Sequence, residues 1–228
     1  MVTKYLTNVR LSDQSVFEKI YEALKKEIYF GSLRPGDRLI EEELAKRFDV
    51  SRSSVRIVLQ RLVGDGFITV VPNKGTTVKK FSIDEIAECY KLQGLLEGFA
   101  SAEALKYLTD GDIESLRKIQ AEMRRNLASN EMENYLRENI HFHRILVRKC
   151  GITMLIELIK KQKDLIYRYS FIFLSIPGRI ETNLSHHDMI IEVAEKRDYD
   201  QMRSIVEMHY WDSGKNLRGH FEKIPLFF

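Results

Sequence analysis

The chain has 228 residues, 44% of them hydrophobic and 30% charged, which suits a soluble globular protein with a hydrophobic core. No apolar run reaches the ~18 residues of a membrane span, the first residues lack the apolar region of a signal peptide, and two cysteines give no disulfide framework. We therefore expect a cytoplasmic protein without membrane association.

The charge is unevenly distributed along the chain. Residues 1–80 contain 15 Lys and Arg against 10 Asp and Glu, a net charge of +5, whereas the remainder carries −2. This asymmetry favours a polyanionic partner for the first third of the chain.

Three helices are predicted in that first third. Apolar residues recur at helical spacing over residues 15–29, with Ser12 and Asp13 as candidate caps. A Pro-Gly turn then precedes a short helix over 40–48, whose first turn holds three glutamates. Ser51 can cap a third helix that runs to about residue 63.

The pattern then becomes extended. Residues 67–71 and 76–78 are rich in β-branched side chains and flank a turn, which predicts a β-hairpin. The remainder predicts helices over residues 84–107, 111–128, 131–149, 152–174, 179–196 and 199–218. The predicted fold class is mainly α, with a winged helix-turn-helix domain over 1–80 and an all-helical bundle over 81–228.

The third helix has the features of a DNA-reading helix. Its buried stripe leaves Arg52, Arg56 and Gln60 at i, i+4 and i+8 on the opposite face. Arginine can read guanine and glutamine can read adenine through paired hydrogen bonds. Ser53 and Ser54 lie at the helix start, where hydroxyl and backbone N–H groups bind phosphates. Taken alone, Arg52 and Arg56 fit an ordinary solvated helix face equally well.

The hairpin tip completes the motif. Lys74 and Gly75 give it the basic and flexible character of a wing that follows the DNA backbone or the minor groove. The ordered set of helix, Pro-Gly turn, helix, Ser-capped basic helix and Gly-tipped hairpin favours DNA binding over the solvated-face interpretation.

Residues 31–78 resemble the GntR family of winged-helix repressors. The resemblance includes the Pro-Gly-Asp turn, the run VSRSSVRIVLQRLVGDG over 50–66, and the Lys-Gly tip of the hairpin. It implies that Arg52, Arg56, the intervening serines and the wing tip contact double-stranded operator DNA. Some members place an arginine of the second helix against DNA where this chain has Glu42, which would repel phosphate.

Three histidines of the helical region have informative spacing. His187 and His209 each lie 11 residues from Asp198. If their helices form an antiparallel hairpin about that residue, both side chains lie ~16 Å from the turn, at the same level. A third helix with Asn139 and His143 on one face could complete a cluster in the bundle. Spacing alone favours structural or surface histidines over a metal site.

Residues 83–220 resemble the FCD ligand-binding domain of the FadR branch of this family, through the segments YKLQGLLEGFASAEA, FHRILVRKCG and HHDMIIEVAEKRDYDQMRSIVEMHYW. The resemblance implies a divalent metal held by His143, His187 and His209 together with Asn139, where the family has an aspartate. Imidazole-rich ligation suits Zn, Ni or Co better than Mg or Ca.

The same resemblance implies a small-molecule effector in the helical domain. Many relatives carry an arginine in the first helix of this domain, where this chain has Gln93, and Arg168 lies on another helix that could line the cavity. We expect both to bind the effector, a small organic acid, and we interpret Glu97 as structural. A homodimer is expected, because two-fold proteins read palindromic sites.

Two other functions remain as alternatives. A metal site with open positions could serve a metal-dependent hydrolase, although no Ser or Cys nucleophile motif and no His-Glu-x-x-His motif is present. An architectural DNA-binding protein without an effector would instead have a solid helical core. The sequence favours a ligand-responsive transcription regulator that is not an enzyme.

Overall fold

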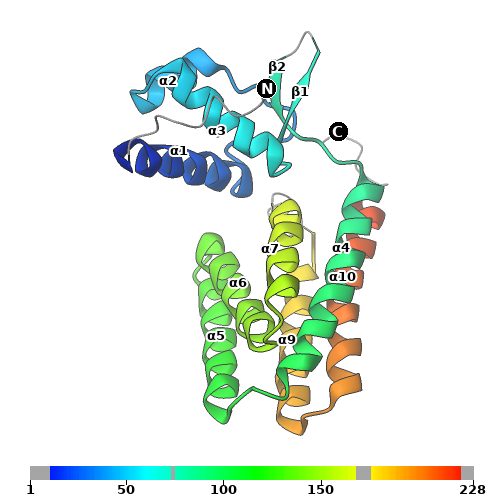
Figure 1. Cartoon of the computed structure of the whole chain (residues 1–228). Coiled ribbons are helices and arrows are strands. Elements are labelled where there is room, and N and C mark those ends of the chain that lie inside the picture. The colour runs from blue at the N-terminus through cyan, green and yellow to red at the C-terminus, as the bar shows by residue number, and fades with distance from the viewer. Residues whose placement is uncertain (1–10, 73–74, 168–175, 222–228) are drawn as a thin grey trace. The chain divides into compact units, whose positions relative to one another are not determined.

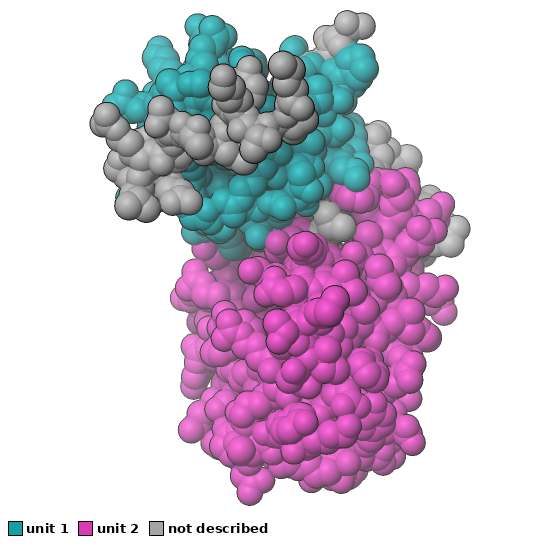
Figure 2. Space-filling view, viewed as in Figure 1, with its two compact units in different colours: residues 1–80 teal, residues 81–228 magenta. Residues whose placement is uncertain are grey.

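The computed structural model describes residues 11–72, 75–167 and 176–221. The chain divides into two compact units, residues 1–80 and residues 81–228 (Figure 2). Helices predominate in both, with one short hairpin in the first unit, as predicted (Figure 1). Each unit has its own packing, so the two are described separately.

The first unit opens with three helices, α1 (Leu11–Tyr29), α2 (Glu41–Phe48) and α3 (Arg52–Gly64). Its core includes five side chains that are each at most 1% exposed, namely Leu24, Ile28, Val55, Leu62 and Phe67. Ser51 caps α3 as expected, because its Oγ accepts from the backbone N–H of Ser54 at 3.1 Å. This cap fixes where the third helix begins.

The predicted start of α1 was wrong. The described part of α1 is helical from Leu11 on, so Ser12 and Asp13 lie within the helix and do not precede it. Serine and aspartate occur inside helices as well as before them, so the residue types alone do not decide the boundary.

The hairpin consists of β1 (Ile68–Val71) and β2 (Gly75–Val78), which pair antiparallel with Val71 opposite Gly75. The sequence pattern missed a further extended segment beside it. The backbone N–H of Leu39 donates to Thr76 O, and that of Val78 donates to Asp37 O, both at 2.9 Å. The segment that follows the Pro-Gly turn therefore pairs with β2 and anchors the hairpin to the helices.

The second unit is a helical bundle. Its described helices are α4 (Ile83–Ala104), α5 (Asp110–Ala128), α6 (Met132–Lys149), α7 (Thr153–Tyr167), α9 (Arg179–Lys196) and α10 (Tyr199–Phe221). The predicted helix over 152–174 can be followed only to Tyr167, because the rest of it lies outside the described residues. None of the described helices is long and apolar enough to cross a membrane.

Glycines bring α4 and α10 close together, and the two helices run side by side in Figure 1. A Cβ added to Gly94 would lie 2.9 Å from Trp211 Nε1, and one added to Gly98 would lie 3.0 Å from the carbonyl oxygen of Arg203. A side chain at either position would push the helices apart. The close approach places the buried face of α4 against the helix that carries His209.

A tight turn joins α9 to α10. Arg197 adopts a left-handed backbone conformation with φ of 54°, and its guanidinium donates to the carbonyl oxygens of Leu105 and Leu108 at 3.1 and 2.7 Å. The two helices pack together as the expected hairpin. His187 and His209 consequently reach the same level of the bundle.

Candidate metal centre and DNA-reading face

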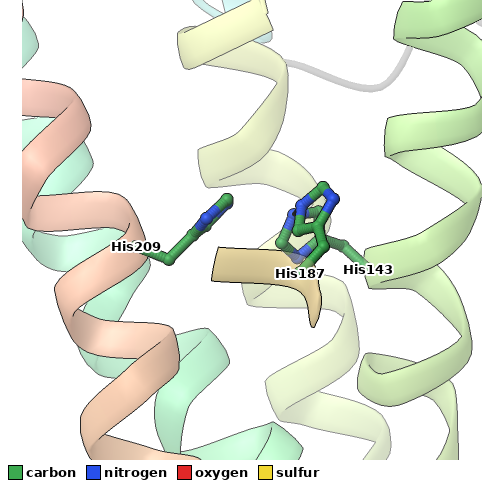
Figure 3. Close-up of side chains that lie close together, drawn as sticks. All are labelled: His143, His187 and His209. Carbon is green, nitrogen blue, oxygen red and sulfur yellow. Dashed lines mark hydrogen bonds between the residues drawn. The ribbon is translucent and has the colours of Figure 1, made fainter. Parts of the chain in front are cut away.

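Three histidines converge inside the second unit. His143 comes from α6, His187 from α9 and His209 from α10 (Figure 3). One ring nitrogen from each lies within 4.8 Å of the other two, and all three side chains are buried. Within the cluster, His143 Nε2 and His187 Nε2 are 3.3 Å apart.

The outer ring nitrogens of two of these histidines face acceptors. His143 Nδ1 lies 3.2 Å from Glu97 Oε2, and His187 Nδ1 lies 3.3 Å from Gln120 Oε1. The Gln120 amide is oriented by its nitrogen, which donates to Leu184 O at 2.7 Å and to Asp188 Oδ1 at 2.9 Å. A carboxylate and an amide oxygen only accept, so the tautomer that satisfies both contacts is the one that carries the proton on Nδ1.

His143 Nε2 and His187 Nε2 face each other across 3.3 Å, and in the tautomer with both Nδ1 atoms protonated each Nε2 offers a lone pair. Burial, the largest cause, lowers the pKa of both imidazoles below the ordinary value, for His187 well below it. Burial likewise holds the pKa of His209 well below its usual range. The cluster is therefore a set of neutral imidazoles, the form that binds a metal ion.

Asn139 lies one turn before His143 on α6 and, like His143 and His209, lines a cavity beside the cluster. Its Oδ1 accepts a hydrogen bond from Asn183 Nδ2 at 3.4 Å. The amide oxygen therefore stands beside the histidines, oriented by a neighbour on α9. An amide oxygen can ligate a cation, but it brings no negative charge.

A cavity of about 50 Å³ adjoins the cluster, which is room for a few water molecules or a small ligand. Its lining is largely aromatic and polar, and it includes Tyr90, Tyr135, Asn139, His143, Lys163, Tyr167, Asn183, His209, Tyr210 and Ser213. A cavity with polar side chains among aromatic rings distinguishes the unit from a solid helical core.

The buried carboxylate of Glu97 links the cavity to the cluster. Its Oε1 accepts from Lys163 Nζ at 2.8 Å and from Gln93 Nε2 at 2.5 Å, while its Oε2 faces His143. Burial acts to raise the pKa of Glu97, but Lys163 and His143 together outweigh it and hold the pKa well below the ordinary value. Glu97 is therefore an anion inside the bundle.

The structure describes one of the two residues that were expected to bind the effector. Gln93 is fully buried, and its amide nitrogen is bonded to Glu97. Arg168 lies outside the described residues. Sequence reasoning missed Lys163 and Gln120 and interpreted Glu97 as structural, since no spacing within one helix indicates contacts with helices far away in the chain.

Arg179 of α9 supports the cluster from another side. Its guanidinium donates to the carbonyl oxygen of His209 at 3.4 Å and to the hydroxyl of Ser213. The side chain is only 2% exposed, and burial lowers its pKa. It therefore fixes the turn of α10 that carries His209.

In the first unit, α3 exposes the predicted reading face. Arg52, Arg56 and Gln60 are exposed on one side, opposite the buried Val55, Val58, Leu59 and Leu62. Ser53 is exposed and Ser54 half-buried, and their hydroxyls lie 2.7 and 2.8 Å from Ser51 Oγ. The helix start thus carries a cluster of hydroxyl groups.

At the hairpin, Gly75 has a φ of 78°, a conformation that favours glycine, while Lys74 lies outside the described residues. Sequence reasoning missed Arg38, whose exposed side chain lies beside this turn. A Cβ added to Gly75 would lie 3.8 Å from the Arg38 guanidinium. Arg38 thereby adds a positive charge near the wing.

Two ion pairs join α2 to the reading face. Arg56 donates to Glu41 through Nε at 3.0 Å and through NH2 at 2.8 Å. Arg52 donates to Glu42 through NH2 alone, at 3.2 Å. Both carboxylates belong to the acidic first turn of α2. The sequence indicated that these glutamates favour a helix start, but it did not indicate their contacts with α3.

Comparison with known proteins places these features in a family. Residues 17–78 match the family model of bacterial regulatory proteins of the gntR family, and residues 88–211 match the FCD domain. The Nta operon transcriptional regulator of Aminobacter aminovorans is 30% identical, over 84% of this chain and 86% of that protein. The HTH-type transcriptional repressor RspR of Escherichia coli K12 is 26% identical, over 90% of each chain.

Among solved structures, E. coli McbR/YncC superposes with a TM-score of 0.76 at 21% identity, covering 90% of this chain and 98% of that one. The likeness agrees with a winged helix-turn-helix followed by an all-helical domain. The family consists of transcriptional regulators, so the hydrolase alternative does not apply. This chain belongs to the GntR family of bacterial transcriptional regulators and carries an FCD domain after its DNA-binding domain.

Proposed function

We propose that this protein controls transcription by binding operator DNA with an affinity set by a small anionic effector, which binds beside a divalent metal in the second unit. The observation that carries the proposal is the pair of imidazole nitrogens, His143 Nε2 and His187 Nε2, facing each other at 3.3 Å. Their opposite nitrogens face Glu97 and Gln120, so neither ring can turn its lone pair away without losing an acceptor.

The donor set fits a metal ion. Two nitrogens bound to one zinc ion at ~2.0–2.1 Å in tetrahedral geometry lie about 3.3 Å apart, the separation of the His143 and His187 nitrogens. His209 supplies a third imidazole, and Asn139 an oxygen on the cavity side. Three imidazoles favour Zn, Ni or Co. A bound cation would supply positive charge and open positions toward the cavity.

Charge favours an anionic effector. The three imidazoles and Asn139 are neutral, and Glu97 and Lys163 balance each other. A divalent ion would therefore leave the site with two uncompensated positive charges, which a carboxylate can reduce. Lys163 lines the cavity with its side chain 12% exposed, so it can turn its ammonium toward such a ligand. A small organic acid is the class of effector that this chemistry fits.

The DNA contacts belong to α3 and the hairpin. The exposed side of α3 would contact DNA through Arg52, Ser53, Ser54, Arg56 and Gln60. Lys74 and Gly75 would contact it as the tip of the wing. One reading helix covers too few base pairs for a unique site, so a homodimer on a palindromic operator is part of the proposal. Light scattering should give about twice the chain mass of 26.8 kDa.

The metal test compares His187→Ala with His141→Ala, a change of a half-buried histidine on the same helix as His143. Both proteins are stripped with a chelator and re-supplied with Zn²⁺, Ni²⁺ or Co²⁺. The parent protein and the His141 variant should retain about one ion per chain by elemental analysis, and the His187 variant should retain none. No metal in the parent protein after re-supply would overturn the metal site.

The DNA test uses duplexes that the purified protein selects from a randomised pool. Arg56→Ala should weaken their binding roughly tenfold or more, as expected for loss of a base-reading arginine. Small carboxylates such as acetate, lactate or citrate should change that binding in the metal-loaded protein and not in the His187 variant. Equal responses in both would remove the metal from the effector mechanism.

A further inference from the structure

Arg52 and Arg56, the arginines of the α3 reading face, are held by acidic residues of α2 in two different ways. Glu41 contacts Arg56 with both carboxylate oxygens, at 3.0 and 2.8 Å, whereas Glu42 contacts Arg52 with one oxygen at 3.2 Å. The Glu41 side chain is 30% exposed and the Glu42 side chain 74% exposed. The first pair is a two-point clamp at the helix–helix junction, and the second is a single contact in solvent.

The clamp leaves the outer end of Arg56 available. A guanidinium has five N–H donors in a fixed plane, and Glu41 engages one on Nε and one on NH2. The remaining donors, on NH1 and on the outer side of NH2, form the edge that can pair with O6 and N7 of guanine. The hydrogen bond to Glu41, the largest cause, also raises the pKa of Arg56 above its ordinary value. The clamp restricts the swing of the side chain without using its reading edge.

Arg52 is restrained much less. Its one hydrogen bond fixes no plane, and both partners are mostly exposed. DNA that approaches Arg52 meets the exposed carboxylate of Glu42 at the same place. This negative charge repels phosphate and competes with it for the guanidinium.

We propose that Glu41 is a positioning residue that holds Arg56 for base reading, and that Glu42 weakens the contact of Arg52 with the DNA backbone. The two acids act on different properties of DNA binding. Glu41 increases the preference for particular base pairs, and Glu42 lowers the affinity that does not depend on sequence. Together they raise the ratio of specific to non-specific binding. The inference rests on the proposed DNA-reading role of α3.

The test uses single changes of three neighbouring glutamates. Glu41→Gln, Glu42→Gln and Glu43→Gln each remove one negative charge from the first turn of α2. Glu43 is exposed, and no ion pair to it is found in the described part of the chain, so its variant controls for net charge. Each protein selects duplexes from a randomised pool, and affinity for one non-selected duplex is measured over a series of salt concentrations. Circular dichroism melting checks folding.

Arg56→Ala should abolish the preference for guanine at one base pair of the selected site. Glu41→Gln should lower the preference at that base pair by about tenfold, a change that lies within the discrimination a bidentate arginine–guanine contact provides. Glu42→Gln should keep the base preference and steepen the slope of log K against log salt by about 0.9, as expected for one added phosphate contact. Glu43→Gln should leave the guanine preference unchanged. Its salt slope should change only by the general effect of removing one negative charge, which all three variants share.

Each part of the inference can fail separately. An unchanged guanine preference in Glu41→Gln, in a protein where Arg56→Ala does lose it, overturns the positioning role. A salt slope in Glu42→Gln equal to that in Glu43→Gln overturns the role of Glu42. If Arg56→Ala itself selects the same sequences as the parent protein, the proposed reading role of α3 fails instead, and the two failures are thereby distinguished.

Discussion

Glu97 Oε2 lies 3.2 Å from His143 Nδ1, although the two residues lie on different helices and are more than forty positions apart in the chain. Both side chains are buried, at 0% and 1% exposure. A carboxylate at the outer nitrogen of a histidine fixes its tautomer and raises its basicity as a ligand. The charge balance of the site then depends on Lys163, which contacts the other carboxylate oxygen at 2.8 Å.

Glu97→Gln should lower the affinity for Zn²⁺ by about 10- to 100-fold, the range found when a partner behind a metal-binding histidine is removed. The amide keeps the shape of the side chain but can present its NH2 group to His143 and supplies no charge. The affinity can be measured by competition with a chromophoric chelator.

Loss of Glu97 also leaves Lys163 buried beside a neutral group, which costs stability independently of metal. The double variant Glu97→Gln with Lys163→Met removes both charges and serves as the control. It should melt closer to the parent protein than the single variant does, while its zinc affinity stays low. A double variant with the zinc affinity of the parent protein would show that Glu97 does not support the site.

Asn139→Asp should raise the affinity for divalent metal about tenfold or more, because it adds a full negative charge beside the cation. The matched control is Asn134→Asp on the same helix, whose side chain donates to Glu131 away from the cavity. Titration of both variants with Zn²⁺ compares equal charge changes in two places. Equal affinities would place Asn139 outside the coordination sphere.

Lys163 should determine whether carboxylates stabilise the metal-loaded protein. In the double variant Glu97→Gln with Lys163→Met, the increase in melting temperature caused by acetate, lactate or citrate should be smaller than in Glu97→Gln alone. Arg144→Met, a change of an exposed basic residue on α6, is the control for net charge. If the increase in melting temperature persists without Lys163 but disappears without Arg144, the carboxylate binds at the outer face of α6 and not at Lys163.

Asp112 should contribute stability that depends on pH. It accepts from the Thr109 backbone N–H at 2.8 Å and lies 2.7 Å from Lys149 Nζ, and the bond to Lys149, the largest cause, lowers its pKa to about 2. Because the folded pKa lies below the ordinary value of 3.8, this stability is present above about pH 4 and is lost as the pH falls toward 2.

Asp112→Ala should therefore cost about 1 kcal/mol at neutral pH, mostly from the cap, because the partly exposed ion pair is screened by solvent. The deficit should shrink in acid. Asp110→Ala, at a fully exposed carboxylate in the same helical turn, should cost less. Urea unfolding of both variants at neutral pH and near pH 3 provides the comparison, and a deficit that is constant with pH would contradict the assignment.

Local sequence pattern determined most of the secondary structure. The cap at Ser51 and the buried stripe of α3 were predicted from residues within one helix, where capping and 3.6-residue periodicity act over a few positions. The common level of His187 and His209 followed from counting residues on either side of Asp198, since helix rise is constant. The start of α1 was predicted incorrectly, because several residue types are compatible with either side of a helix start.

Only the tertiary structure decided which side chains meet across helices. The contacts of Glu97 with Lys163 and His143, and of Gln120 with His187, join residues that are more than forty positions apart in the chain and lie on different helices. Likewise, the sequence marked Glu41 and Glu42 as a favourable helix start, whereas the packing of α2 on α3 paired them with Arg56 and Arg52. Sequence spacing fixes which face of a helix a residue occupies, but interhelical packing sets its partner on that face.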